Sequence, residues 1–183
     1  MTTLMIICFF IFIKYIFSIM KLSKYIGGII MLLNELVEKK LTSYEEKFDD
    51  WKDAVRANGQ ALKAEGYIED QYIDAVVECI EKYGPYIVIA PNIAMPHSTE
   101  GAPGVLKTGI GFMKVEEPVH FDENDPEKDA RLFFMLASNN PDEHLNNIMQ
   151  LSEMLSNDDL VADLLECKND EDVLKVAEKY KEA

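Results

Sequence analysis

The chain has 183 residues, of which 48% are hydrophobic and 28% are charged, with 9 Gly and 7 Pro. This length and composition exclude a disordered or collagen-like chain and suit one domain with its own core. The 33 acidic and 18 basic residues give a net charge of −15, which excludes a nucleic-acid-binding surface because phosphate contacts need Lys and Arg. The three cysteines form no CxxC motif, so we expect reduced thiols and a cytoplasmic protein.

Residues 1–30 form an apolar leader that holds three lysines and no acidic residue. Its apolar run over residues 4–20 is about as short as a membrane span can be and contains Lys14. The leader also lacks the basic start and the cleavage site of a secretory signal. Two interpretations stay open: translation begins at Met31 and the leader is upstream sequence, or the leader is a membrane anchor. In both, the folded domain comprises residues 31–183.

After the leader, helical and extended patterns alternate along the chain. Apolar residues at helical spacing predict helices over residues 32–41, 51–65, 69–82, 141–155, 158–167 and 170–181. Short apolar runs predict strands over residues 86–90, 105–115 and 131–138. We expect the first of these strands to be buried on both faces and the last to be central. Helices on a mixed sheet predict one α/β domain.

Two further segments between these elements are informative. Residues 118–129 are acidic and rich in turn-forming residues, so we expect a connection there. Gly109 and Gly111 lie inside a predicted strand, where they indicate close packing rather than a nucleotide-binding loop.

The sequence lacks the common phosphate-loop, dinucleotide, zinc-protease and serine-hydrolase motifs, which leaves its histidines as candidates for chemistry. His97 follows Pro96 where an extended segment enters a Gly/Pro-rich loop. Proline fixes its own φ and pushes Met95 toward extended geometry, so the backbone that presents His97 is stiff. A stiffly held imidazole suits a nucleophile. The alternative is a solvated loop histidine.

His144 lies in the first turns of the helix predicted to begin at Pro141. We expect Asn140 to cap this helix and Glu143 to complete a capping box. The free N–H groups and the dipole of a helix start favour an anion such as a phosphoryl group. The alternative is that His144 only covers the helix end.

His120 alternates with apolar neighbours, so we expect it at the surface and give it no role. The three histidines show no i, i+3 or i, i+4 spacing. We therefore expect neither a metal site nor a cofactor.

Three segments together resemble a known family: PYIVIAPNIAMPHS from Pro85, LKTGIGFM from Leu106 and ARLFFMLASNNPDEHL from Ala130. They resemble the mannitol–fructose (type 2) class of IIA components of the bacterial sugar phosphotransferase system, and look closest to its ascorbate-type branch. The resemblance extends from about residue 32 to the C-terminus. It implies a three-layer α/β sandwich in which a mixed central sheet is flanked by helices.

The resemblance also implies a phosphoryl relay that serves uptake of ascorbate or a related sugar. In such a relay, His97 accepts a phosphoryl group from phospho-HPr and passes it to a cysteine of a IIB component, which works with a membrane IIC component. His144 flanks the active histidine and, with Ser98, helps to hold the phosphoryl oxygens. The alternative is a regulatory phosphoprotein of the nitrogen-related IIA type, which acts by binding partner proteins.

One departure from the family pattern concerns charge near the phosphoryl group. Mannitol-type members carry an arginine in the helix before the Pro-His strand, whereas residues 77–81 here hold none. This argues against mannitol as the sugar and requires that charge neutralisation come from elsewhere. The acidity of the chain fits a basic donor face on HPr, or serves solubility alone.

Overall fold

The structure, a computed structural model, describes residues 28 and 30–181. Five strands build its sheet: β1 Thr42–Glu45, β2 Val88–Ala90, β3 Asn92–Ala94, β4 Gly109–His120 and β5 Asp129–Ala137. Their order across the sheet is β1-β4-β5-β3-β2. The pairs β1–β4 and β3–β5 are parallel, whereas β4–β5 and β2–β3 are antiparallel. The sheet is therefore mixed, as predicted.

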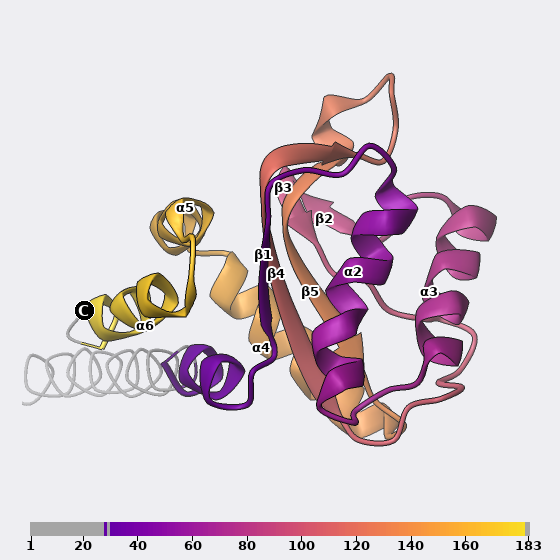
Figure 1. The fold of residues 1–183 in the computed structure, drawn as a ribbon, viewed down its shortest axis with the longest axis horizontal. Coiled ribbons are helices and arrows are strands. Elements are labelled where there is room, and N and C mark those ends of the chain that lie inside the picture. The colour runs from indigo at the N-terminus through magenta and orange to yellow at the C-terminus, as the bar shows by residue number, and fades with distance from the viewer. Residues whose placement is uncertain (1–27, 29, 182–183) are drawn as a thin grey trace, which may run out of the picture.

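Helices cover both faces of this sheet and complete three layers (Figure 1). One face carries α2 Trp51–Ala64 and α3 Asp70–Tyr83. The other carries a helix that includes residues 30–38, together with α4 Pro141–Leu155, α5 Asp158–Glu166 and α6 Asp170–Lys179. The predicted helices and the predicted α/β sandwich are thus confirmed.

The middle strand β5 lies at the centre of the core. Its residues Leu132, Phe133, Phe134 and Met135 are fully buried, because helices cover both faces of the strand. The prediction that this strand is central is confirmed. The core continues into β4, where Phe112 packs its ring against that of Phe134 at a centroid distance of 5.1 Å.

The turn that ends α3 determines where the strand pair β2–β3 begins. Gly84 caps α3 with a φ of 78°, a conformation that favours glycine because it lacks a Cβ atom. Pro85 follows and cannot continue the helix. The chain therefore leaves α3 in a sharp turn and enters β2 within a few residues.

The short strands differ from the sequence predictions. β2 is shorter than the predicted strand 86–90 and lies at the sheet edge, with Ile89 47% exposed rather than buried. An apolar run has the same sequence pattern in an edge strand as in a central strand, because the two differ only in the strands and helices that pack beside them. The strands β1 and β3 were not predicted as strands. β4 begins at Gly109 rather than residue 105 and continues to His120, so the β4–β5 connection is shorter than expected.

The two glycines of β4 confirm the prediction of close packing. A Cβ atom at Gly109 would lie 2.5 Å from Cδ1 of Tyr67, and one at Gly111 would lie 3.0 Å from Cγ of Leu62. A side chain at Gly109 would therefore clash with the Tyr67 ring.

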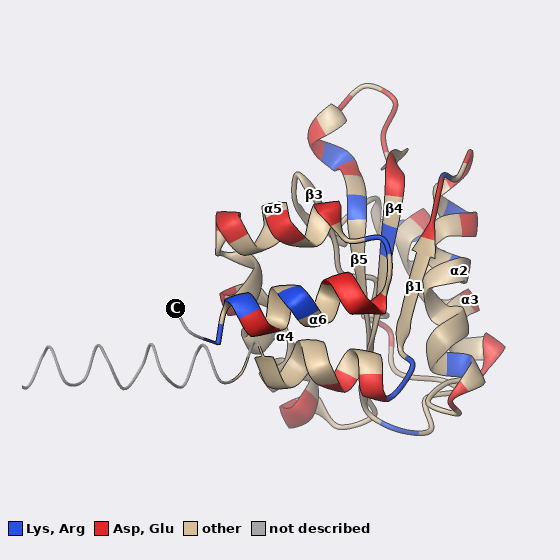
Figure 2. Ribbon diagram, turned by 60° about the vertical axis from the view of Figure 1, so that its left-hand side comes forward, with Lys and Arg blue, Asp and Glu red and all other residues tan. Residues whose placement is uncertain are grey.

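Acidic residues are spread over α5, α6 and the β4–β5 connection (Figure 2). Residues 1–27 and 29 lie outside the described residues, and so does the predicted leader apart from positions 28 and 30. Over residues 28 and 30–181, no helix has the length and apolar character needed to cross a membrane.

Candidate functional site

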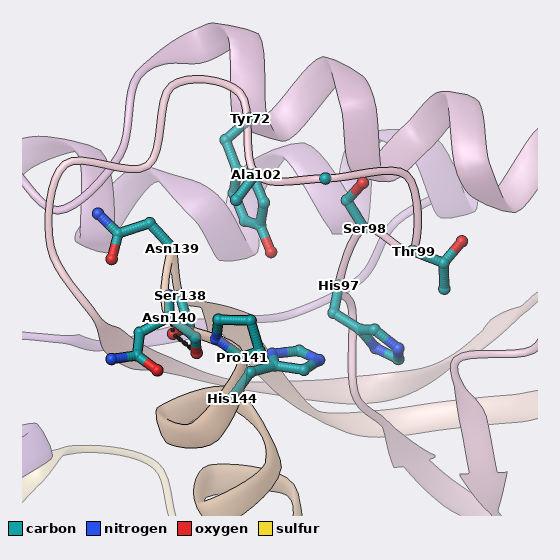
Figure 3. A pocket seen from close by; sticks show the side chains of 11 residues that line it. Tyr72, His97, Ser98, Thr99, Ala102, Ser138, Asn139, Asn140, Pro141 and His144 are labelled. Atoms are coloured by element: carbon teal, nitrogen blue, oxygen red, sulfur yellow. Dashed lines mark hydrogen bonds between the residues drawn. The ribbon is translucent and has the colours of Figure 1, made fainter.

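A cavity of about 500 Å³ opens where β3 and β5 end and α4 begins (Figure 3). In open α/β sheets, ligands bind beyond the carboxyl ends of parallel strands, and β3 and β5 form such a pair. The lining residues are Tyr72, His97, Ser98, Thr99, Gly101, Ala102, Ser138, Asn139, Asn140, Pro141 and His144. The structure thus brings the three predicted site residues, His97, Ser98 and His144, to one cavity.

The segment that presents His97 is paired on both sides, beyond the end of β3. The Met95 N–H donates to the Ile87 carbonyl at 2.8 Å, and the Leu136 N–H donates to the Pro96 carbonyl at 2.9 Å. This pairing holds the backbone up to His97, in agreement with the expectation of a stiff presentation. The chain turns into the exposed loop at Thr99 only after this residue.

The imidazole of His97 is oriented by its own backbone. Nδ1 lies 2.7 Å from the Met95 carbonyl oxygen, and a carbonyl oxygen can only accept a hydrogen bond. In the neutral ring Nδ1 therefore carries the proton and Nε2 carries the lone pair. Nε2 is thus the nitrogen available to attack an electrophile.

Two aromatic rings pack against His97. The ring of Tyr86 meets it edge to face, with centroids 5.3 Å apart and planes at 89°, while the Tyr86 hydroxyl donates to the His97 carbonyl. The ring of His144 lies 5.6 Å away at a tilt of 52°. His97 is consequently half-buried between groups that restrict its rotation.

His144 is positioned by the start of α4. The Asn140 side chain accepts from the backbone N–H groups of Asp142 and Glu143 at 2.9 and 3.3 Å, which confirms Asn140 as the cap. Burial, together with repulsion from a protonated His97, lowers the pKa of His144 below its ordinary value. The ring is therefore neutral near pH 7.

The predicted capping box at α4 is wrong. The carboxylate of Glu143 accepts from the Thr108 hydroxyl instead of reaching back to the N–H of Asn140. Ser138 accepts from that N–H at 3.2 Å. Thr108 also lies 3.2 Å from Ser138 through their hydroxyl oxygens, so the segment before β4 occupies the place that a capping box would need. Sequence spacing could not reveal this competitor.

The hydroxyl of Ser98 points toward α3 and away from the His97 imidazole (Figure 3). It accepts from the Glu100 N–H at 3.3 Å and lies 3.5 Å from the sulfur of Cys79. Burial acts to raise the pKa of the Cys79 thiol, but hydrogen bonds from Ser98, Thr99 and Glu100 outweigh it and lower that pKa. Ser98 lines the cavity, while its hydroxyl oxygen is engaged with the loop and lies beside Cys79.

The lining of the cavity contains no permanently charged side chain, although the protein is strongly acidic. The lining includes no carboxylate and neither Lys nor Arg. An incoming anion would meet no negative side chain among the lining residues, and its hydrogen-bond donors would be His144 and the side-chain amides of Asn139 and Asn140. The Ser138 hydroxyl is not free for this task, because it donates to the Asn140 carbonyl at 2.9 Å.

The other tyrosine near His97 anchors the strand behind it. The Tyr72 hydroxyl donates to the Leu136 carbonyl at the end of β5, and burial raises the pKa of Tyr72 to about 12. Neither Tyr72 nor Tyr86 was singled out from the sequence, since a tyrosine in an apolar run carries no signal of its own.

The third histidine, His120, is exposed at the far end of β4 and pairs with Asp129 at 2.8 Å.

Comparisons with known proteins agree on one family. The sequence model described as "Phosphoenolpyruvate-dependent sugar phosphotransferase system, EIIA 2" matches residues 35–180. The "Ascorbate-specific PTS system EIIA component" of Escherichia coli (strain K12) is 30% identical over 153 residues, which are 81% of this chain and 96% of that protein.

Solved structures give the same result. A "putative PTS IIA domain" from Streptococcus pyogenes M1 GAS aligns with a TM-score of 0.71 at 29% identity, over 83% of this chain and 97% of that one. The complex of enzyme IIAMTL with phosphorylated enzyme IIBMTL from Escherichia coli aligns with a TM-score of 0.65 at 30% identity, over 76% of this chain and 95% of that one.

Proposed function

Because the chain belongs to the EIIA type 2 family of the phosphoenolpyruvate-dependent sugar phosphotransferase system, we propose that it relays a phosphoryl group through His97. The observation that carries the proposal is the hydrogen bond from His97 Nδ1 to the Met95 carbonyl. It leaves the Nε2 lone pair free at a cavity that holds no carboxylate.

In the first step the donor is phospho-HPr. The Nε2 lone pair of His97 attacks the phosphorus atom and forms a P–N bond. The P–N bond of the donor histidine breaks, and its electron pair returns to the donor ring. In the second step the thiolate of a IIB cysteine attacks the same phosphorus atom, and the electron pair of the P–N bond returns to Nε2.

Such transfers need little covalent help, so positioning and charge stabilisation carry most of the rate. His144 is suited to the second task. Its pKa is lowered while His97 is unmodified, but a phosphoryl group on His97 replaces that neighbour with an anion and raises the proton affinity of His144. A ring 5.6 Å away can then donate a hydrogen bond to a phosphoryl oxygen.

The proposed partners follow from the relay. A IIB component is the acceptor, which is supported by the similarity to enzyme IIAMTL in its complex with phosphorylated enzyme IIBMTL. HPr is the donor, the membrane IIC component takes part indirectly, and the relay operates in the cytoplasm. Ascorbate or a related sugar is the transported compound, in keeping with the name of the Escherichia coli relative.

The experiment mixes the purified protein with HPr, enzyme I and labelled phosphoenolpyruvate, and then adds a panel of IIB components. We expect one acid-labile, base-stable phosphate on the wild-type chain and none on His97→Ala. His120→Ala, which alters an exposed histidine far from the cavity, should be labelled like the wild type. Labelling of His97→Ala at the wild-type level would overturn the proposal. Labelling without delivery to any IIB component would favour the regulatory alternative.

A further inference from the structure

Tyr86 comes to lie beside His97 because of the register between β2 and β3. Val88 pairs with Ala94, and the bond between the Ile87 carbonyl and the Met95 N–H continues this pairing. Tyr86 therefore lies beside the segment that precedes His97. The turn that holds it is itself fixed, since the Tyr86 N–H donates to the Gly84 carbonyl at 2.8 Å and the Val88 N–H donates to the Pro85 carbonyl at 3.1 Å.

Tyr86 makes two different contacts with the same histidine. Its hydroxyl donates to the His97 carbonyl, and this bond fixes the main chain at the last residue before the exposed loop. Its ring packs perpendicular to the imidazole, with centroids 5.3 Å apart and planes at 89°, and this contact restricts the side-chain rotation that the backbone leaves free. Burial raises the pKa of Tyr86 above its ordinary value, so the hydroxyl remains a donor at physiological pH.

The side chain does not line the cavity, so Tyr86 does not meet a phosphoryl group there. Its effect on transfer must pass through His97. The hydrogen bond from Nδ1 to Met95 forms only while the imidazole keeps its present rotation, and that bond decides which nitrogen carries the lone pair.

We propose that Tyr86 is a positioning residue for the phosphoacceptor, which holds the main chain and the ring of His97 so that Nε2 stays unprotonated and directed to the cavity. The proposal rests on the proposed function in so far as His97 is the acceptor. The effect of Tyr86 on the rotation and the tautomer of His97 can be measured without any phosphoryl donor.

The first measurement is the single-turnover rate of phosphorylation at saturating phospho-HPr. Tyr86→Phe keeps the ring and removes one hydrogen bond, so we expect a rate about fivefold to tenfold lower. Tyr86→Leu removes both contacts, and we expect a loss on the order of 100-fold, since small misplacements of a reacting atom have effects of this size.

Tyr44→Phe is the matched control. Tyr44 is also half-buried, its hydroxyl donates to Asp170 at 3.0 Å, and its ring meets Phe112 edge to face. It lies on β1, away from the cavity. Tyr44→Phe should lose as much thermal stability as Tyr86→Phe and keep the wild-type phosphorylation rate.

The second measurement is the tautomer of His97 by nitrogen-15 NMR. We expect the Nδ1–H form in the wild type, in Tyr44→Phe and in Tyr86→Phe, which keeps the ring contact, and a mixture of both tautomers in Tyr86→Leu. Wild-type rates and a wild-type tautomer in folded Tyr86→Leu would overturn the proposal. A slow Tyr86→Leu with an unchanged tautomer would also overturn it, because the loss would then be one of general stability.

Failure of the proposed function would look different. The wild-type chain would then accept no phosphate from phospho-HPr, while the tautomer of His97 would still respond to Tyr86→Leu.

Discussion

The imidazoles of His97 and His144 lie 5.6 Å apart between ring centroids, with their planes tilted by 52°, although His97 follows β3 and His144 is the fourth residue of α4. A positive charge on His97 would repel one on His144, and this repulsion adds to burial in lowering the pKa of His144. The pair can therefore hold one neutral nucleophile and one group whose proton affinity depends on what the first carries.

Loss of His144 should slow the transfer without removing the attachment point. One charge-stabilising hydrogen bond at a transition state is worth roughly 10²- to 10³-fold in rate. We expect His144→Ala to be slowed by about 10- to 100-fold, since the amides of the cavity and groups of the partner protein share the task. His144→Gln should recover part of the rate, because its amide can donate a hydrogen bond but cannot carry a positive charge.

Single-turnover rates for both steps, from phospho-HPr and to the IIB component, would check this. His120→Ala is the control, and mass spectrometry should find the phosphate still on His97. If His144→Ala transferred at wild-type rates in both steps, His144 would only cover the helix end.

The pH dependence of stability should carry a contribution from His144. Its folded pKa is lowered, first by burial and then by a protonated His97, so on acidification the unfolded chain takes up its proton before the folded chain does. Well above the unfolded pKa of about 6.5 the group has no effect. As the pH falls below that value toward the folded pKa, stability is lost.

Urea denaturation at about pH 8 and about pH 5.5 would measure this loss. In His144→Gln the free energy of unfolding should fall less on acidification than in the wild type. The control is His120→Gln, which replaces an exposed histidine in the same way, and its pH dependence of stability is compared with that of His144→Gln. Identical pH dependence in the wild type and in His144→Gln would contradict the lowered pKa.

The sequence predicts those elements whose signal is local. Most of β5, residues 132–137, is one unbroken apolar run, and its central place follows from that run. β1 gives no such run, since an edge strand pairs on one side only and keeps its residues half-exposed. β3 has three residues, and its existence depends on pairing with β5, which no window of sequence contains.

The same distinction applies to the site. Pro96-His97 and Asn140 with His144 are local motifs, and the sequence identifies them. The contact of Tyr86 with His97 depends on the register between two strands. The capping box at α4 fails because of Thr108, a residue brought there by tertiary packing. The sequence therefore identifies the histidines that would carry the chemistry. It does not identify the residues that position these histidines, because those contacts form only in the folded chain.

A chain that begins at Met31 should fold and accept phosphate as the full chain does. Among the residues that the structure describes, the first core residues are Leu32, Leu33 and Leu36, and all of them follow Met31. We therefore expect an unchanged free energy of unfolding in urea and an unchanged single-turnover rate. Peptide mapping of the native protein gives the other half of the test. Recovery of residues 1–30 from a membrane fraction would support the anchor instead.

Asn140 combines a structural and a functional role, and two substitutions should separate them. Asn140→Ala removes the cap of α4, which costs about 1 kcal/mol of stability and loosens the turn that carries His144. Asn157 caps α5 in the same way, accepting from the Leu160 N–H at 3.1 Å, but lies outside the cavity lining. Asn157→Ala should therefore lose similar stability and keep its rate of phosphorylation, whereas Asn140→Ala should be slower.

Asn140→Asp tests whether the phosphoryl group sits at the start of α4. Aspartate caps a helix about as well as asparagine, so the free energy of unfolding in urea should change little. The new carboxylate would, however, stand in a cavity whose lining holds none, where it repels a phosphoryl group. We expect Asn140→Asp to be phosphorylated at least about 10-fold more slowly than the wild type, in line with the loss of one charge interaction at a transition state. Asn157→Asp, which adds the same charge at the other cap, should transfer at the wild-type rate. Equal rates for the two aspartate variants would mean that the phosphoryl group is held elsewhere and that α4 contributes only its fold.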